Sequence, residues 1–362
     1  MTFERDNISR MAGYSYGEQP DDESVIKLNT NENPYPCSPD VQQALTTIST
    51  DSLRRYPPAL ANNFRTAAAE LHGVKVENII ATRGGDELLR LLFSTFANPG
   101  DVIAMTEPTY SLYPVLAQIQ DARVLGLPLA DDWSLPGDFA DAANNARAKM
   151  TFVVNPHAPS GKLIPSDEIR QLAANLDSIL LVDEAYVDFI DPAHHYNCLD
   201  LVSDHENVIF LRSLSKGYGL AGLRFGYGIG HASLIEPMLT KTRDSYNIDA
   251  ISQQLASAAL IDQEYARNTW EMVRTSRASL SISLEERGFN SVDSESNFLL
   301  ATVPGSASAQ ALYEGLKELN ILVRFFNVSG LDDKLRMTVG TEQENAALLK
   351  AVDKLLGDLP LR

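Results

Sequence analysis

Residues 207–230, NVIFLRSLSKGYGLAGLRFGYGIG, place a single lysine between two apolar runs. The first run, Val208–Ser213, is rich in β-branched and aromatic residues and predicts a buried strand, and residues 225–230 predict a second strand. Lys216 follows the first strand almost directly. Because burial disfavours the charged amine and lowers its pKa, a lysine at the end of a core strand suits a Schiff-base nucleophile.

Further apolar runs alternate with helical patterns on the N-terminal side of this stretch. The runs are NIIAT, DVIAM, MTFVVN and SILLVDEAY, and the helical patterns include DELLRLLFSTFANPGD, YSLYPVLAQIQ and PSDEIRQLAANL. The runs are apolar throughout, as in strands that helices cover on both faces. The pattern therefore predicts an α/β fold with a mostly parallel sheet.

The pattern of apolar and polar residues changes near residue 248, where long helical stretches begin. After them, NFLLATV, ILVRFF and KLRMTVG predict strands between helices, as in a smaller α+β domain. We therefore predict a polar N-terminal arm over residues 1–30, a large domain over 31–247 and a small C-terminal domain over 248–362. The arm is expected to pack on the small domain or on a partner subunit.

Charge and cysteine content restrict the classes of function. The 362 residues carry a formal net charge of −18, which disfavours non-specific binding to nucleic acid or to anionic membranes. Only two cysteines occur, Cys37 and Cys198, without the spacing of a metal site or a disulfide framework. The N-terminus has no apolar signal core, and no apolar run has membrane-spanning length. A cytoplasmic protein is expected.

Several polar groups follow predicted strands, where ligands bind in open α/β sheets. Gly84, Gly85 and Asp86 lie between a strand and a helix, and a helix N-terminus favours an anion such as phosphate. Asp86 would equally serve as an N-cap. Ser213, Ser215 and Arg224 surround Lys216 in the sequence and could hold a phosphate.

A second group of polar residues follows two other strands. Asp183 and Glu184 end the run ILLVDE, and a carboxylate that leaves a buried strand needs a partner. A structural ion pair is the alternative to a catalytic role. The segment NPHAPSG, residues 155–161, follows TFVV and would in isolation be a plain turn.

Two other patterns have simpler explanations. Residues 217–222, GYGLAG, match G-x-G-x-x-G, but a strand follows them where a dinucleotide site needs a helix. His194 and His195 are adjacent in a polar stretch, which predicts a loop rather than a metal site. No zinc-type cysteine pairing, P-loop or H-E-x-x-H motif occurs, so we predict no metal.

Taken together, these segments resemble the fold-type I family of pyridoxal-phosphate enzymes, and within it the histidinol-phosphate aminotransferases. The resemblance covers nearly the whole chain. It rests on the order and spacing of LNTNENPYPCSP, RYP, RGGDELL, EPTYSLY, NPHAPSG, VDEAYVDF, RSLSKGYGLAGLRFGY, SNFLL, ILVRFF and LRMTVGT. These motifs are more specific for the cofactor than for the substrate.

The resemblance implies a role for each candidate residue. Lys216 would bond the pyridoxal phosphate and then move a proton, Asp183 would pair with the pyridine nitrogen, and Tyr186 would donate to the ring oxygen. The other implied cofactor contacts are Gly84, Gly85, Asp86, Tyr110, Asn155, Ser213, Ser215 and Arg224. Implied substrate contacts are Asn33, Tyr56 from a partner subunit, Arg324 for a phosphate and Arg336 for an α-carboxylate. Taken singly, each of these tyrosines and arginines could instead be structural.

The chain departs from the family pattern at two positions. The family usually has Asn-Pro-Thr-Gly at the third motif, with the asparagine on the ring oxygen, and Ala158 takes that place here. Asn155 or His157 could reach the ring instead, and we favour Asn155. In KTRDSYNID, residues 241–249, Ser245 stands where the family commonly has proline.

The implied function is transfer of an amino group from L-histidinol phosphate to 2-oxoglutarate in histidine biosynthesis, by a cytoplasmic homodimer with shared active sites. One alternative is an aromatic amino-acid aminotransferase, which keeps every motif and changes only the pocket. Another is a lyase similar to threonine-phosphate decarboxylase, which would release carbon dioxide. A non-catalytic regulator on the same fold is disfavoured because Lys216 and Asp183 are both present.

Overall fold

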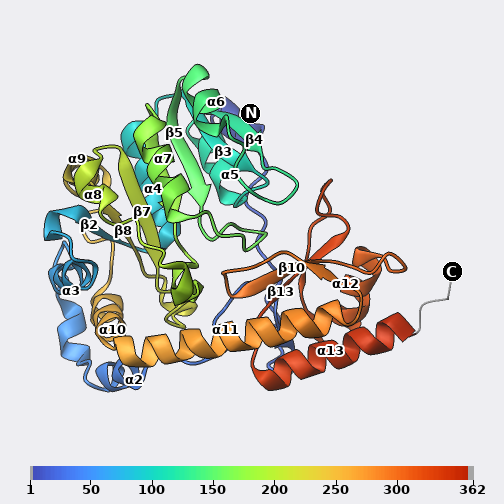
Figure 1. Ribbon diagram of the computed structural model, residues 1–362. Coiled ribbons are helices and arrows are strands. Elements are labelled where there is room, and N and C mark those ends of the chain that lie inside the picture. The colour runs from blue at the N-terminus through green and yellow to red at the C-terminus, as the bar shows by residue number, and fades with distance from the viewer. Residues whose placement is uncertain (1–2, 358–362) are drawn as a thin grey trace.

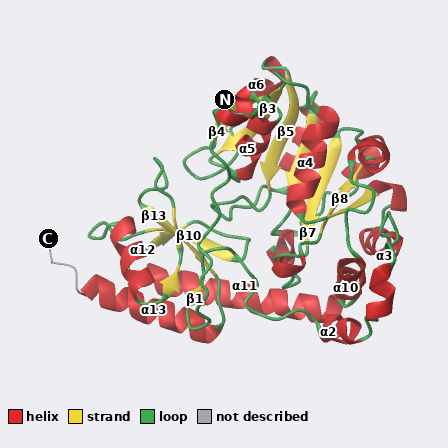
Figure 2. Ribbon diagram, turned by 180° about the vertical axis from the view of Figure 1, so that it is seen from behind, coloured by secondary structure: helices red, strands yellow, loops and turns green. Residues whose placement is uncertain are grey.

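The computed structural model describes residues 3–357, which form a large α/β part and a smaller C-terminal part (Figures 1 and 2). The predicted fold class is confirmed by the central sheet and by the comparisons given below. Residues 1 and 2 of the predicted arm, and residues 358–362 of the predicted C-terminal domain, lie outside the described part. None of the helices within residues 3–357 has the length and apolar character needed to cross a membrane.

The large part is built on a seven-stranded sheet in the order β2-β8-β7-β6-β5-β3-β4. The strands from β7 to β4 are parallel to their neighbours, and β8 is antiparallel to both β2 and β7. Their bounds are β2 (Ile79–Thr82), β3 (Val102–Glu107), β4 (Arg123–Pro128), β5 (Ala148–Val154), β6 (Ile179–Asp183), β7 (Val208–Ser213) and β8 (Gly226–Gly230).

Helices cover both faces of this sheet, which is why its central strands are apolar throughout. Along β6, Leu181 packs toward one face, while Leu180 and Val182 pack toward the other. Helices α4 (Gly85–Phe96), α5 (Leu112–Ile119) and α9 (Ala232–Pro237) cover the first face. Helices α3 (Asn62–His72), α6 (Phe139–Asn145), α7 (Ser166–Asn175) and α8 (Leu201–Asp204) cover the second.

The C-terminal part contains a four-stranded sheet in the order β12-β13-β10-β9, with antiparallel pairing throughout. The strands are β9 (Asn290–Ser291), β10 (Phe298–Thr302), β12 (Arg324–Phe325) and β13 (Lys334–Thr338). Helices α12 (Ala309–Glu318) and α13 (Glu342–Gly357) pack with this sheet, and α11 (Gln263–Glu285) runs beneath both parts of the molecule (Figure 1).

The predicted strand ILVRFF is divided between two sheets. Its first residues form β11 (Ile321–Leu322), which pairs in parallel with β1 (Ile26–Lys27). Its later residues form β12, which pairs with β13. Val323 lies between the two strands and is buried. The pairing of β1 with β11 fixes the segment that follows β1 against the C-terminal part.

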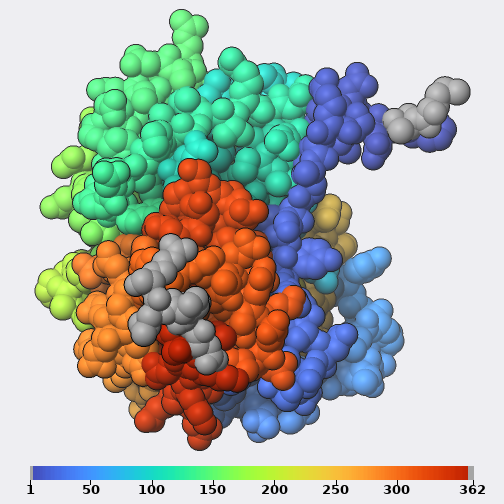
Figure 3. Space-filling view, turned by 90° about the vertical axis from the view of Figure 1, so that its right-hand side faces the viewer, coloured from blue at the N-terminus to red at the C-terminus, as the bar shows by residue number. Residues whose placement is uncertain are grey.

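The N-terminal segment runs along both parts of the molecule (Figure 3, dark blue). In its first helix, α1 (Asp6–Ser9), the Asn7 amide donates to the Gln118 carbonyl at the end of α5. Further along, Glu18 forms a 2.8 Å ion pair with Lys317 on α12. This segment therefore contacts both the C-terminal part and the large part, and its assignment as a separate arm stays a prediction.

Helix α10 (Ala250–Ile261) packs against α2 (Pro39–Thr46) and α3, both of which belong to the large part. The domain boundary after residue 247 stays a prediction, but this packing would place α10 with the large domain.

A buried arginine joins the two parts near the middle of α11. Arg277 donates to the carbonyl oxygens of Phe189 in the large part and Ser296 in the C-terminal part, at 3.1 and 2.9 Å. It also forms a 2.8 Å ion pair with Glu295, whose carboxylate accepts from the backbone N–H of Asp191 as well. A guanidinium group suits this position because its several donors can satisfy several acceptors at once.

Replacing Arg277 with leucine is expected to lower the free energy of unfolding by about 3 kcal/mol, because Glu295 loses its cationic partner and two carbonyl oxygens lose a donor. Urea denaturation followed by circular dichroism would measure the change. The control is Lys75→Met, which removes a 3.7 Å ion pair whose side chains are 80% and 63% exposed. That variant should lose less than about 1 kcal/mol. Equal losses in the two variants would contradict the role given to Arg277.

Candidate active site

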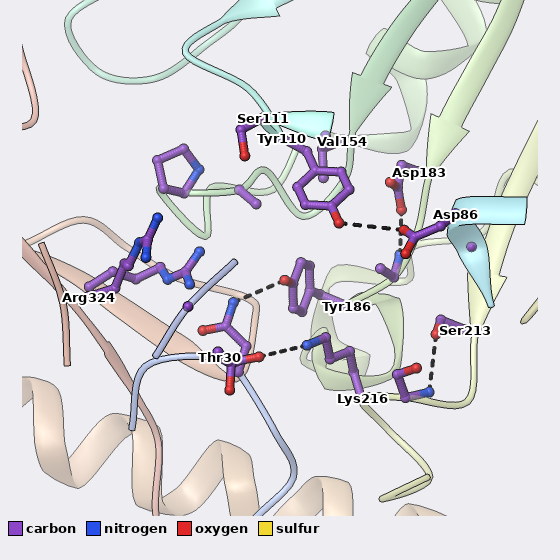
Figure 4. Close-up of a pocket in the computed structure, with 18 of the residues that line it drawn as sticks. Thr30, Asp86, Tyr110, Ser111, Val154, Asp183, Tyr186, Ser213, Lys216 and Arg324 are labelled. Atoms are coloured by element: carbon purple, nitrogen blue, oxygen red, sulfur yellow. Dashed lines mark hydrogen bonds between the residues drawn. The ribbon is translucent and has the colours of Figure 1, made fainter. Parts of the chain in front are cut away.

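A cavity of about 620 Å³ lies between the two parts, at the C-terminal ends of β5, β6 and β7. Its wall includes Val154, Asp183 and Ser213 from those strands, and Arg324 and Arg336 from the C-terminal sheet. Figure 4 shows Tyr110, Asp183, Tyr186 and Lys216 converging on this space. The sheet positions the cavity because its parallel strands bring their polar terminal residues to the same edge.

Lys216 lies in the turn after β7, with its amine in the cavity. Its Nζ donates to the carbonyl oxygen of Thr30 at 2.8 Å (Figure 4). Burial, followed by the nearby positive charge of Arg336, lowers the pKa of Lys216 to about 8. This is the direction predicted from its place at the end of a core strand. A large fraction of the amine is therefore neutral near pH 8 and able to act as a nucleophile.

Asp183 ends β6 and is 4% exposed. It accepts hydrogen bonds from the Tyr113 hydroxyl at 2.6 Å and from the backbone N–H of Ala185 at 3.1 Å. Burial nevertheless raises its pKa to about 6, although both hydrogen bonds lower it. The structure therefore holds a carboxylate in a dry site, where a cationic N–H donor would stabilise its charge. Its neighbour Glu184 points elsewhere and forms a buried ion pair with Arg212 at 2.6 Å.

A group of donors lies around the N-terminus of α4. The helix begins at Gly85, and Gly84 precedes it with a φ of +77°, in the region that favours glycine. A Cβ at Gly84 would lie 3.0 Å from the guanidinium group of Arg224. Arg224 also contacts the Ser215 hydroxyl at 3.4 Å and the Asp86 carboxylate at 3.3 Å. Helix N–H groups, a hydroxyl and a guanidinium group form the donor set of a phosphate site.

Arg324 and Arg336 lie directly opposite one another on β12 and β13, and both line the cavity. Each guanidinium group lies 5.5 Å from the ring of Phe326, which also lines the cavity. The Nε atom of Arg336 is buried and has no hydrogen-bond partner within residues 3–357. Two guanidinium groups and one unused donor are suited to bind an anionic substrate group.

The structure brings most of the predicted site residues to the cavity. Those that line it are Gly85, Asp86, Tyr110, Asp183, Tyr186, Ser213, Ser215, Lys216, Arg224, Arg324 and Arg336. Gly84 lies just behind this wall, against Arg224. Their individual roles remain predictions.

Three predicted site residues lie away from the cavity wall. The Asn155 amide bonds to the backbone N–H and carbonyl of Ile164, at 2.8 and 2.9 Å, so the turn itself uses both ends of the side chain. Asn33 donates to the Gly217 carbonyl at 3.0 Å. Tyr56 is 79% exposed and stacks on Tyr246, with ring centroids 4.4 Å apart. The cofactor contact predicted for Asn155 is therefore not favoured by its position.

Several residues of the site were not predicted from the sequence. Tyr113 bonds Asp183, and it occurs three positions after Tyr110 in EPTYSLY, a spacing that could have placed both on one side of a helical turn. Tyr14 from the arm lies edge-on to Tyr110 at 6.0 Å. Thr30 acts through its backbone, so no side-chain pattern could have identified it. Asn31, which donates to the Tyr186 hydroxyl, lies within the quoted motif LNTNENPY.

Comparison with known proteins supplies the family. A family model described as aminotransferase class I and II matches residues 23–352. The chain belongs to the class I and II aminotransferase family. It is 45% identical over 353 residues to histidinol-phosphate aminotransferase 1 of Trichormus variabilis, with 97% of this chain and 98% of that protein covered. The predicted resemblance to the family is thereby confirmed.

Solved structures of aminotransferases share the fold. The crystal structure of histidinol-phosphate aminotransferase from Sinorhizobium meliloti in complex with pyridoxal-5′-phosphate has a TM-score of 0.87 at 24% identity, and the match covers 92% of this chain and 91% of that chain. L-threonine-O-3-phosphate decarboxylase from Porphyromonas gingivalis has a TM-score of 0.80 at 20% identity, with 92% and 100% covered. The fold therefore occurs in both a transferase and a lyase, so the fold alone does not distinguish these two classes of enzyme.

The residues of this aminotransferase cavity fit pyridoxal phosphate, the cofactor that the sequence motifs imply. The donors around the N-terminus of α4 match its phosphate group, and the buried Asp183 carboxylate matches a protonated ring nitrogen. Lys216 supplies an amine of lowered pKa for its aldehyde. Tyr110 and Ala158 line the space that the ring would occupy between these groups.

We expect the cofactor-free protein to capture added pyridoxal phosphate at a rate that rises with pH through about 8, because only the neutral Lys216 amine reacts. Stopped-flow absorbance would measure this rate. In Arg336→Gln the midpoint of this pH dependence should move to higher pH, since the positive charge that lowers the pKa of Lys216 is removed. Arg324→Gln, which removes a charge on the opposite strand, is the matched control. A wild-type midpoint near the ordinary lysine value of 10.5 would contradict the interpretation.

Proposed function

We propose that this chain transfers the amino group of L-histidinol phosphate to 2-oxoglutarate, with pyridoxal phosphate as cofactor, in the cytoplasmic synthesis of histidine. Family membership and the curated relatives support the reaction class. The observation that argues most directly for the substrate is the pair Arg324 and Arg336. These two residues place two cations opposite each other on one side of the cavity that holds Lys216.

The cofactor and the chain divide the chemistry between them. When bound, pyridoxal phosphate supplies an aldehyde that bonds amines and a ring that withdraws electrons from the adjacent carbon. Asp183 would keep the ring nitrogen protonated, because a buried carboxylate strongly favours a cationic partner. The Lys216 amine, once free of the cofactor, can accept and return a proton at the amino-bearing carbon because its pKa lies near neutrality.

The C-terminal part would orient the substrate by its anionic group. A phosphate ester carries up to two negative charges near neutral pH, and both guanidinium groups can donate to it. A carboxylate carries one charge and can be held by Arg336 alone through a bidentate contact. The same cavity can therefore accept a phosphorylated amino donor in one half-reaction and glutamate in the other. Such an arrangement also explains how an acidic protein of net charge −18 binds two anionic substrates.

We further propose that two copies of the chain share their active sites. Tyr56 lies outside the cavity of its own chain, is 79% exposed and forms an exposed stack with Tyr246. An exposed pair of large aromatic rings is typical of a protein interface. In a two-fold dimer each subunit could then offer this pair to the site of the other.

The first test follows single half-reactions by absorbance. L-Histidinol phosphate should convert the bound cofactor to its amino form, and L-phenylalanine should do so at least tenfold more slowly. The phenyl ring tests the side-chain pocket without supplying a phosphate. Faster conversion with phenylalanine would assign the chain to aromatic amino acids, and release of carbon dioxide without a keto product would indicate a lyase.

Two variants test the residues assigned to this reaction. Lys216→Ala should abolish transamination while the circular dichroism spectrum stays unchanged. Arg324→Gln should raise KM for L-histidinol phosphate at least tenfold, because a charge-assisted hydrogen bond contributes about 1.5–3 kcal/mol, and should change KM for L-glutamate less. Retained activity in Lys216→Ala, or equal effects of Arg324→Gln on both substrates, would contradict these assignments.

The shared site is tested by mixing inactive subunits. Lys216→Ala and Tyr56→Ala should each have low activity alone. After unfolding and refolding together, about a quarter of the sites should combine an intact lysine with an intact tyrosine if pairing is random and two-fold. Activity that stays at the sum of the separate variants would exclude a shared site.

A further inference from the structure

Asn31 occupies a buried position between the two parts of the molecule. It is 2% exposed, and its φ of +58° places it in the left-handed region, which asparagine tolerates better than most residues. Its backbone carbonyl oxygen accepts from the side-chain amide of Asn297, the residue before β10, at 2.9 Å. Its side chain contacts Tyr186 of the large part and Thr338 of β13.

Asn31 forms hydrogen bonds through both its backbone and its side chain. The backbone N–H of Asn31 can only donate, and it donates to the Thr338 hydroxyl oxygen at 3.0 Å. The Thr338 hydrogen is then free to reach the Asn31 side-chain oxygen at 3.2 Å. The amide nitrogen of Asn31 faces Tyr186 and donates to its hydroxyl at 3.0 Å.

A hydroxyl oxygen that accepts from Asn31 has its own hydrogen free for another partner. Within residues 3–357 the Tyr186 hydroxyl has no protein acceptor, and Tyr186 lines the cavity. The side chain of Ala158 is a methyl group, which lines the same cavity and offers no donor. The Tyr186 hydrogen is therefore a principal side-chain donor available to the ring oxygen of the cofactor.

We propose that Asn31 is a positioning residue that directs the Tyr186 hydroxyl hydrogen into the cavity, toward the ring oxygen of pyridoxal phosphate, and that links this hydrogen to the position of β13. The inference rests on the cofactor of the proposed function but not on the identity of the amino donor.

The link to β13 connects Tyr186 with the residue assigned to the substrate anion. Thr338 and Arg336 are two residues apart on β13, so their side chains point to the same face of the strand. A movement of β13 when Arg336 binds an anion would change the contact between Thr338 and Asn31. The Tyr186 hydroxyl would thus respond to the substrate through two hydrogen bonds, from Thr338 to Asn31 and from Asn31 to Tyr186.

The charged surroundings of Tyr186 set the direction of the expected effect. Burial raises the pKa of the Tyr186 phenol, while Arg336 and the Asn31 hydrogen bond lower it; Asp183 and Tyr14 raise it. Loss of Asn31 would therefore make Tyr186 a weaker donor. A ring oxygen that receives a weaker hydrogen bond stays more negative and stabilises the proton on the nitrogen that joins Lys216 to the cofactor. That proton would then be lost at higher pH.

The test is a pH titration of the absorbance band of the lysine-bound cofactor, without any amino donor. Asn31→Ala should raise the midpoint by about one pH unit, the shift that corresponds to one hydrogen bond. Thr338→Val should raise the midpoint less, because the Asn31 amide keeps its donor and loses only the hydroxyl that orients it. In a Tyr186→Phe background, Asn31→Ala should cause no further shift, since the hydroxyl through which it acts is absent.

The control is Asn345→Ala, which removes another buried amide of the C-terminal part, whose side-chain bonds within residues 3–357 go to Gly340. It should lower the thermal stability of the cofactor-free protein but leave the midpoint unchanged. If Asn31→Ala does not fold, Asn31→Asp keeps the shape of the side chain and removes the donor. Because the aspartate also adds a negative charge, the same substitution in the Tyr186→Phe background measures the effect of that charge alone. An unchanged midpoint in the Asn31 variants, or an equal shift without the Tyr186 hydroxyl, would overturn the proposal. Failure of the wild type to convert L-histidinol phosphate would overturn only the proposed substrate.

Discussion

Two ionisable groups in the cavity, the Asp183 carboxylate and the Lys216 amine, are withdrawn from water at the ends of the neighbouring strands β6 and β7. Burial shifts the pKa of both groups toward their neutral forms, to about 6 for the acid and about 8 for the amine. Holding them there requires strands buried on both faces, and these in turn require helices on both sides of the sheet. The layered architecture and the reactivity of the site therefore have the same physical origin.

The site is assembled from two parts that contribute different chemistry. The large part contributes the lysine, the carboxylate and the phosphate-binding helix terminus, while the C-terminal part contributes two guanidinium groups. Like charges directly opposite each other in a sheet repel, so Arg324 and Arg336 are tolerated here because Phe326 contacts both and an anion can join them. Arg277 joins the same two parts on another side.

Patterns that depend on local physics could be predicted from the sequence. Continuous apolar runs indicated the central strands, and the positions of Asp183 at the end of β6 and of Lys216 just after β7 made both residues candidates for the site. Strand β4 was missed because it lies at the sheet edge and is half exposed, so it lacks such a run. The division of ILVRFF between β11 and β12 depends on partners far away in the sequence. The hydrogen bonds of Asn155 show a different limit, because its partner Ile164 is near in sequence but meets it only through the geometry of the turn.

The pairing of β1 with β11 affects the order in which parts of the protein fold during synthesis. It brings Ile26 beside Ile321, so the segment that includes Thr30 and Asn31 can reach its place only after most of the chain has left the ribosome. The large sheet can form earlier, since its strands lie between residues 79 and 230. A nascent chain would thus hold the end of β7 and Lys216 without the Thr30 carbonyl that accepts from its amine. The amine would also lack the nearby charge of Arg336, which lowers its pKa, until the last strands are in position.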